Sequence, residues 1–205
     1  MQRIGLMGGS FNPIHCGHIN LARAALDAGL VDRVLFLPSG NPPHKWAGLE
    51  DKLHRLNMVS LAIEGEAGME ICREEVDREG VIYTVDTLAI LRGRMPDCRF
   101  FYLIGADTLR TLHTWRRPED VIRLCTFLVA ARPGEDEKDL PRLMAHWRAQ
   151  GADVQTLPAE CIDVSSTEIR ERLAAGLSLA GLVPAGVEAY IRMHGLYQMN
   201  EEASP

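Results

Sequence analysis

Short apolar runs alternate with stretches whose apolar positions repeat at helical spacing along most of the chain. The apolar runs predict strands near residues 2–7, 33–37, 69–73, 99–104, 125–130 and 153–157. The helical spacing predicts helices near residues 17–28, 50–64, 84–93, 116–123, 137–149, 167–175 and 185–194. Such alternation is typical of a parallel sheet covered by helices. We therefore expect an α/β fold: a doubly wound, mostly parallel sheet with helices on both faces and a C-terminal helical segment.

The length of 205 residues allows a substantial core in a single unit. The sequence has no internal repeat, no low-complexity tract and no obvious linker. We therefore expect one domain over residues 1–198, followed by a disordered tail over residues 199–205.

Composition and charge limit the classes of function. The net charge of −6 argues against a general nucleic-acid-binding surface, so an anionic ligand would need local positive charge. Five cysteines occur without a C-x-x-C pair, which predicts neither a zinc site nor a disulfide framework and favours a cytoplasmic location. No apolar run approaches the roughly 20 residues that span a bilayer, and the N-terminal segment has the pattern of a strand rather than a signal peptide. We expect neither a nucleic-acid nor a membrane partner.

The most informative segment is GGSFNPIHCGH, residues 8–18, which follows the first predicted strand and opens the first predicted helix. Gly8 and Gly9 permit a tight turn with positive φ, and Pro13 stiffens the loop. His15 and His18 would lie where helix N–H groups and the helix dipole favour phosphate. A glycine-rich turn could serve only to turn the chain, but an H-x-G-H tetrad at this place favours a nucleoside-triphosphate site.

A second cluster, VSSTEIR at residues 164–170, lies near the C-terminal end. Ser165 and Glu168 have capping-box spacing, which predicts a helix start with Arg170 in its first turn. This could be no more than a well-capped helix. Hydroxyl and N–H groups beside an arginine also make a phosphate cradle, and two such cradles could hold the two ends of one triphosphate. In a doubly wound sheet, the first and last helix openings can converge at the carboxyl ends of the strands.

Together, these motifs resemble the adenylyltransferase superfamily, in which an H-x-G-H tetrad binds the triphosphate of a nucleotide. The segments between them resemble one branch, the nicotinate mononucleotide adenylyltransferase family, which has a Rossmann-like sheet. The matching segments are Asn41–Lys45, Tyr83–Leu88, Ile104–Asp107 with Trp115, Ala131–Gly134, Leu182–Pro184 and His194–Tyr197. The resemblance runs from residue 3 to about residue 198.

The resemblance implies adenylyl transfer from ATP to nicotinate mononucleotide, giving nicotinate adenine dinucleotide and pyrophosphate in NAD synthesis. Mg²⁺ would be carried mainly by ATP, with no protein metal site, and a homo-oligomer is left open. The implied catalytic residues are His15, His18 and Arg170. The implied ATP-binding residues are Gly8, Gly9, Ser10, Phe11, His15, His18, Ser165, Ser166 and Arg170. The implied mononucleotide-binding residues are Asn41, His44, Lys45, Tyr83, Thr84, Gly105, Asp107, Trp115 and Arg132.

The chemistry of the middle segments fits these roles, although each has a plainer alternative. Trp115 could stack on a pyridine or be an ordinary partly buried tryptophan. Asp107 could accept hydrogen bonds from ribose hydroxyls, but it could also cap a helix, as could Thr84. The resemblance implies that backbone N–H groups around Tyr83 and Thr84 hold the nicotinate carboxylate. Lys45 and Arg132 are candidates for phosphate contacts or solvated surface charges.

The sequence departs from the family pattern at three places. Asn12 stands where aspartate is commoner, Val81-Ile82 replaces Pro-Ser, and Glu135 replaces an aromatic residue. Three competing interpretations remain: transfer to another acceptor such as phosphopantetheine, preference for nicotinamide mononucleotide, and a non-catalytic nucleotide-binding regulator.

Overall fold

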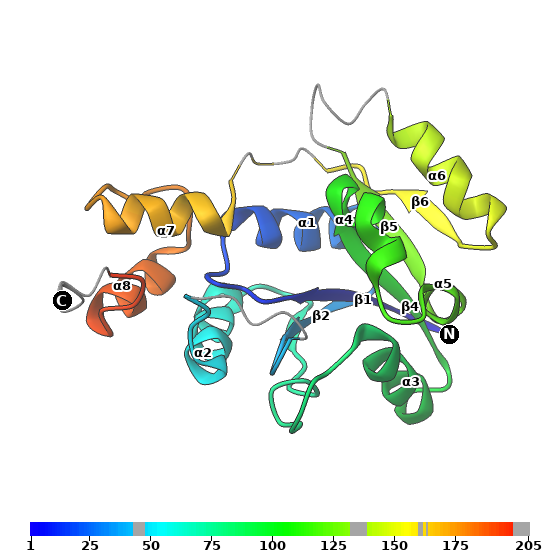
Figure 1. The fold of residues 1–205 in the computed structure, drawn as a ribbon, viewed down its shortest axis with the longest axis horizontal. Helices are drawn as coiled ribbons and strands as arrows, with labels where there is room; N and C mark the ends of the chain where they lie inside the picture. The colour runs from blue at the N-terminus through cyan, green and yellow to red at the C-terminus, as the bar shows by residue number, and fades with distance from the viewer. Residues whose placement is uncertain (43–47, 132–138, 160–161, 163, 199–205) are drawn as a thin grey trace.

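The computed structural model describes residues 1–42, 48–131, 139–159, 162 and 164–198, so the predicted tail lies outside the described residues. Within these ranges, six strands form one sheet in the order β3-β2-β1-β4-β5-β6, and every neighbouring pair is parallel (Figure 1). The strands are Gln2–Gly9 (β1), Arg33–Pro38 (β2), Met69–Ile71 (β3), Cys98–Gly105 (β4), Thr126–Ala130 (β5) and Val154–Thr156 (β6). The predicted doubly wound parallel sheet is confirmed.

Helices connect the strands and complete the C-terminal part of the described chain. They are Cys16–Asp27 (α1), Lys52–Ile63 (α2), Thr84–Arg94 (α3), Ala106–Thr111 (α4), the 3-10 turn Leu112–Thr114 (η1), Pro118–Leu124 (α5), Leu140–Ala149 (α6), Ser166–Ala174 (α7) and Ala185–Met193 (α8). The seven predicted helices are confirmed within about three residues. Helix α4 is not among the predicted helices, because its six residues are too few for a periodic pattern to show. None of the described helices has the length and apolar character needed to cross a membrane.

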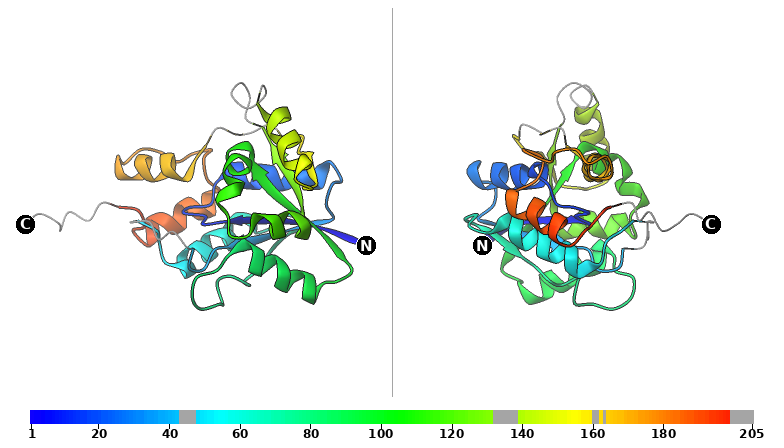
Figure 2. Two further views of the ribbon diagram at one scale, coloured as in Figure 1. Left: turned by 45° about the vertical axis from the view of Figure 1, so that its right-hand side comes forward. Right: turned by 90° about the vertical axis from the view of Figure 1, so that its left-hand side faces the viewer.

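The strand order places a topological switch point between β1 and β4. From β1 the chain builds outwards to β2 and β3, and it then returns to the other side of β1 to build β4, β5 and β6. Ligands of doubly wound sheets bind at the carboxyl ends of the strands beside this point. Figures 1 and 2 show α7 and α8 at that end, away from the N-terminus of the chain.

Alternating strand residues fill two apolar cores, one on each face of the sheet. Ile4 and Leu6 of β1 pack into the core that α3, α4, α5 and α6 cover, whereas Met7 packs into the core that α1, α2, α7 and α8 cover. Because side chains alternate along a strand, this division fixes which residues each helix buries.

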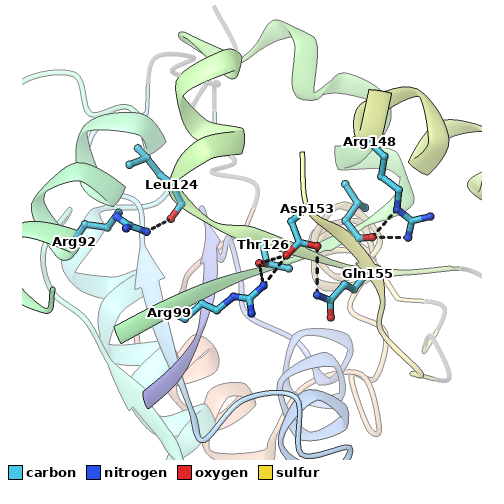
Figure 3. Close-up of polar contacts among 8 residues, drawn as sticks. Arg92, Arg99, Leu124, Thr126, Arg148, Asp153 and Gln155 are labelled. Carbon is cyan, nitrogen blue, oxygen red and sulfur yellow. Dashed lines mark hydrogen bonds and ion pairs between the residues drawn. The ribbon is translucent and has the colours of Figure 1, made fainter. Parts of the chain in front are cut away.

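A polar cluster ties the edge strand to the sheet at the end remote from the switch point (Figure 3). The Asp153 carboxylate accepts hydrogen bonds from Arg99 of β4 at 2.7 Å and from Thr126 of β5 at 2.8 Å. Arg148 of α6 donates from Nε to the carbonyl of Val154 at 3.0 Å. These bonds compensate for the shortness of β6, which has only three residues.

Candidate nucleotide-binding site

A pocket of about 280 Å³ opens at the switch point, between the ends of β1 and β4 and the beginnings of α1 and α7. Eight predicted site residues line it: Gly8, His15, His18, Gly105, Asp107, Trp115, Ser165 and Ser166. The structure therefore brings together the two phosphate motifs, which are about 150 residues apart in the sequence, and the segment around Trp115. The expected convergence of two helix openings is confirmed for the first helix, α1, and for α7, the first helix after the last strand.

The two phosphate motifs are joined by direct hydrogen bonds. Ser165 caps α7, since its side chain accepts from the N–H of Glu168 at 3.1 Å, as the capping-box spacing predicts. Ser166 Oγ donates to the Pro13 carbonyl at 2.8 Å. Arg170 donates to the carbonyl of Asn12, also at 2.8 Å. The start of α7 is therefore fixed against the loop that opens α1.

His15 and His18 stack at the start of α1. Their ring centroids are 3.7 Å apart, and the backbone N–H of His15 donates to Nδ1 of His18 at 3.3 Å. Burial lowers the pKa of His18 well below its ordinary range, and the neighbouring His15 lowers it further. Neutral His18 with Nδ1 as acceptor carries its proton on Nε2. That N–H is a hydrogen-bond donor at a pocket that already has the positive end of a helix dipole.

Two glycines of the first motif, Gly8 and Gly17, are needed for space rather than for positive φ. The expectation of a positive-φ turn at Gly8 and Gly9 is wrong, because β1 continues through Gly9 and neither residue has positive φ. A Cβ on Gly8 would overlap the hydroxyl of Tyr102. A Cβ on Gly17 would lie 3.0 Å from Nδ1 of His15 and 3.1 Å from Val164. Both glycines therefore let rigid neighbours approach the backbone closely.

The turn itself is made by Phe11, which adopts a left-handed conformation with φ of 48°. Its side chain is 1% exposed and packs edge-on beneath His18, with ring centroids 5.0 Å apart. Strained backbone of this kind persists only where the surroundings enforce it, as in ligand loops. Phe11, Gly9 and Ser10 are not among the lining residues of the pocket, so they shape the loop from behind.

On the opposite wall, Trp115 lies against Tyr102, with ring centroids 5.7 Å apart and planes at 72°. Asp107 lies in the first turn of α4, and its carboxylate folds back over Gly105. The alternative that Asp107 and Thr84 are helix caps is wrong. The N-cap residue of α4 is Gly105, and that of α3, the helix that begins at Thr84, is Tyr83. Asp107 and Thr84 are thus the second and first residues of their helices.

Tyr83, Thr84 and Asn41 do not line this pocket, and Asn41 lines a separate one with Gly40 and Arg55. The guanidinium of Arg116 lies 4.6 Å from the ring centroid of Tyr83. The Thr84 side chain forms a hydrogen bond with buried Tyr102. The carbonyl of Asn41 accepts from the N–H of Ile82 at 3.3 Å, which joins the loop after β2 to the start of α3. His44, Lys45 and Arg132 lie outside the described residues.

Two residues of the site region, Tyr102 and Arg55, are not among the predicted site residues. Tyr102 in β4 contacts the Gly8 backbone, Trp115 and Thr84 at once, and burial raises its pKa above the ordinary range. Arg55 in α2 is 1% exposed and donates to the Ser10 carbonyl. In the sequence, Tyr102 has the pattern of an ordinary strand residue and Arg55 that of a surface charge, so neither carries a signal of a site.

In the described part of the chain, no group of three or more histidine, cysteine, aspartate or glutamate side chains is arranged to hold a metal ion.

Comparisons with known proteins agree with this geometry. A family model described as cytidylyltransferase-like matches residues 6–172. A Neisseria meningitidis serogroup B protein named "Probable nicotinate-nucleotide adenylyltransferase" is 40% identical over 201 residues, 97% of this chain and 100% of that protein. A Thermomicrobium roseum protein of the same name is 39% identical over 206 residues, 100% of this chain and 96% of that protein.

A solved structure supports the fold. The Plasmodium falciparum nicotinic acid mononucleotide adenylyltransferase complexed with NaAD has a TM-score of 0.77 and 17% identity, and the match covers 96% of this chain and 98% of that one. The chain therefore belongs to the cytidylyltransferase-like family and, within it, to the nicotinate-nucleotide adenylyltransferases.

Proposed function

We propose that this protein transfers the adenylyl group of ATP to nicotinate mononucleotide, forming nicotinate adenine dinucleotide and releasing pyrophosphate for NAD synthesis. One observation carries the proposal: both phosphate motifs and the aromatic wall at Trp115 line a single pocket at the switch point. The naming of relatives about 40% identical over nearly the whole chain supports the choice of substrates.

The phosphate motifs supply donors for the triphosphate. Three groups around the pocket favour a bound phosphate: the Nε2–H of His18, the N–H groups at the start of α1 and the capped start of α7. Arg170 adds a full positive charge beside the same loop. Because the attacking phosphate of the mononucleotide is already an anion, no general base is needed. Catalysis then rests on positioning and on stabilising the charge at the transferring phosphoryl group.

The opposite wall supplies groups suited to the mononucleotide. The Trp115 ring can stack on the pyridine, and the carboxylate of Asp107 can accept hydrogen bonds from ribose hydroxyls. The N-terminus of α3 has no side-chain cap, so its first N–H groups are available to a nicotinate carboxylate. We also retain the remaining residues of the predicted set as proposed mononucleotide-binding residues: Asn41, His44, Lys45, Tyr83, Thr84 and Arg132. Among them, Lys45 and Arg132 are the candidates for phosphate contacts.

Mg²⁺ fits this site as part of the substrate. The lining residues offer one carboxylate, Asp107, which agrees with a metal held mainly by nucleotide oxygens and water. The metal would neutralise charge on the triphosphate. We further propose that residues 1–198 act as one domain in the cytoplasm, a location favoured by five cysteines without a C-x-x-C pair. Homo-oligomerisation stays open.

Pyrophosphate release tests the proposal. ATP and Mg²⁺ are supplied with nicotinate mononucleotide, nicotinamide mononucleotide or phosphopantetheine at matched concentrations. We expect strong preference for nicotinate mononucleotide. Preference for the amide would keep the chemistry and overturn the substrate, release with phosphopantetheine alone would overturn the pyridine assignment, and release with none would favour a nucleotide-binding regulator.

His18→Ala tests the role of the first motif. We expect kcat to fall by about 10²–10³-fold with the fold intact, by analogy with the loss of an oxyanion-hole donor. The matched control is His146→Ala, since His146 is exposed on α6 and bonds to Gln150. Near-normal kcat in His18→Ala would remove His18 from the mechanism.

A further inference from the structure

Arg55 is a buried cation that the adenylyl-transfer chemistry described above does not use. It lies in α2, is 1% exposed, and is among the largest fully buried side chains of the described chain. Burial lowers its pKa, while the negative charges of Asp51 and Glu75 oppose this effect. The described residues place no carboxylate within ion-pair distance of its guanidinium, which instead donates to loop groups.

Its guanidinium makes four hydrogen bonds to three loop segments. Nη1 donates to the Ser10 carbonyl at 2.6 Å and to Ser39 Oγ at 3.2 Å. Nη2 donates to the Gly40 carbonyl at 3.1 Å, and Nε donates to the Glu50 carbonyl at 3.0 Å. Four of the five N–H donors of an arginine are thereby used, in the fixed planar geometry that lysine cannot reproduce.

Two of these segments belong to the two halves of the proposed site. Ser10 lies in the triphosphate loop, and Gly40 immediately precedes Asn41 on the mononucleotide side. A direct backbone bond also joins them, from the N–H of Ser39 to the carbonyl of Gly9 at 2.9 Å. The Gly40 backbone also packs closely against the carbonyl of Glu75, which an added Cβ would overlap.

The third segment is attached to the triphosphate loop by Asn12. Its Nδ2 donates to the Gly48 carbonyl at 2.9 Å, and its Oδ1 accepts from the N–H of Glu50 at 3.1 Å. Tyr197 also donates to Oδ1 at 2.9 Å. The loops after β1 and β2 therefore form one assembly, with the Arg55 guanidinium at its centre.

Burying a charge in this way is costly for stability alone. Replacing buried ionic groups with well-packed apolar residues is often neutral or stabilising, so a folding role does not require an arginine here. A rigid fork that bonds to loops from both substrate halves is well suited to fixing the distance between them, and small errors in that distance are costly in group transfer.

We propose that Arg55 is a positioning residue for adenylyl transfer, holding the triphosphate loop at Ser10 and the mononucleotide loop at Ser39 and Gly40 in one fixed arrangement. This inference rests on the proposed function. In this proposal Arg55 contacts neither substrate and acts only through the loop carbonyls to which it donates hydrogen bonds.

Arg55→Lys tests the proposal, with Arg123→Lys as the matched control because the Arg123 side chain is 74% exposed on α5. Steady-state kinetics with both substrates is combined with hydrogen exchange of peptides covering residues 8–15 and 38–42. We expect kcat per folded molecule to fall about 10²-fold while each KM changes by less than about threefold, as for misplaced reacting groups. We also expect faster exchange in both peptides, including the Ser39 amide.

Unchanged exchange in either loop, or kcat per folded molecule within about twofold of the wild type together with a lowered Tm, would overturn the inference and leave Arg55 a structural residue. If Arg55→Lys does not fold, Ser39→Ala removes one of the four bonds without touching the charge, and a smaller change in the same direction is required. Absence of turnover in the wild type would refute the proposed function instead, and hydrogen exchange would then decide the role of Arg55 alone.

Discussion

Glu75 makes the stability of this protein depend on pH in an unusual direction. Burial raises the pKa of its carboxyl from 4.5 to about 7, even though the Thr87 hydroxyl, which donates to it at 3.0 Å, and Arg78 and Arg55 all lower it. Glu74 adds to the increase. The folded state therefore holds a proton that the unfolded chain releases at lower pH, so the contribution of Glu75 to stability is fully present below pH 4.5 and is lost as the pH rises through about 7.

The size of this effect follows from the difference in pKa. Each pKa unit corresponds to about 1.4 kcal/mol, so a change from 4.5 to about 7 corresponds to about 3 kcal/mol in total. Part of the stabilisation by the neutral carboxyl is already lost at pH 5. The effect is further reduced because Glu75 as a whole residue is only partly buried. Between pH 5 and pH 8 we therefore expect its ionisation to cost about 2 kcal/mol.

Glu75→Gln isolates this contribution, because glutamine stays neutral and its Oε1 can still accept from Thr87. Urea unfolding of both proteins at pH 5, 6, 7 and 8 gives the free energy of unfolding at each pH. We expect the stability of Glu75→Gln relative to the wild type to increase by about 2 kcal/mol from pH 5 to pH 8. The control is Glu70→Gln, since the Glu70 side chain is 49% exposed and pairs with Arg33. Parallel pH curves for wild type and Glu75→Gln would refute the reasoning.

Three further outcomes are expected. Gly17→Ala should lower kcat about 10-fold or more, because its Cβ would displace the His15 ring; unchanged steady-state kinetics would contradict the crowding argument. Asn12→Asp should lower the free energy of unfolding by about 1–3 kcal/mol, because it removes the donor to the Gly48 carbonyl and sets two acceptors against each other. Equal urea midpoints for the two proteins would show that this bond is dispensable. EDTA should abolish turnover yet leave the Tm of the unliganded protein unchanged, and a lowered Tm would reveal a protein-held metal that calorimetry can detect.

The sequence predicts the layout of the fold because strands and helices here carry strong periodic patterns. It also predicts that the segments around His18 and Ser165 meet, since helix openings that follow parallel strands share one edge of the sheet. The role of Asn12 can be predicted only in part. Its turn is visible in the sequence, but its bond to Gly48, which aspartate could not donate, depends on tertiary structure.

Other features depend on contacts between residues far apart in the sequence. Position 8 requires glycine because the Tyr102 hydroxyl occupies the space of a side chain, and no local sequence pattern reveals that neighbour. The positive φ expected at Gly8 and Gly9 is found at Phe11. Arg55 follows Lys52 and His54 in α2, so its position suggests a solvated charge. Its burial depends on which face of the helix meets the loops, and only the packed structure decides this.

The bond from Arg170 to the Asn12 carbonyl has a consequence for how the protein is made. These residues are 158 positions apart in the chain. At a synthesis rate of about 5–20 residues per second, the first half of the triphosphate cradle leaves the ribosome roughly 8 to 30 s before its second half. The glycine-rich loop and its histidines therefore spend that interval without the helix that fixes them, and the nascent chain completes its nucleotide site only after residue 170 has emerged.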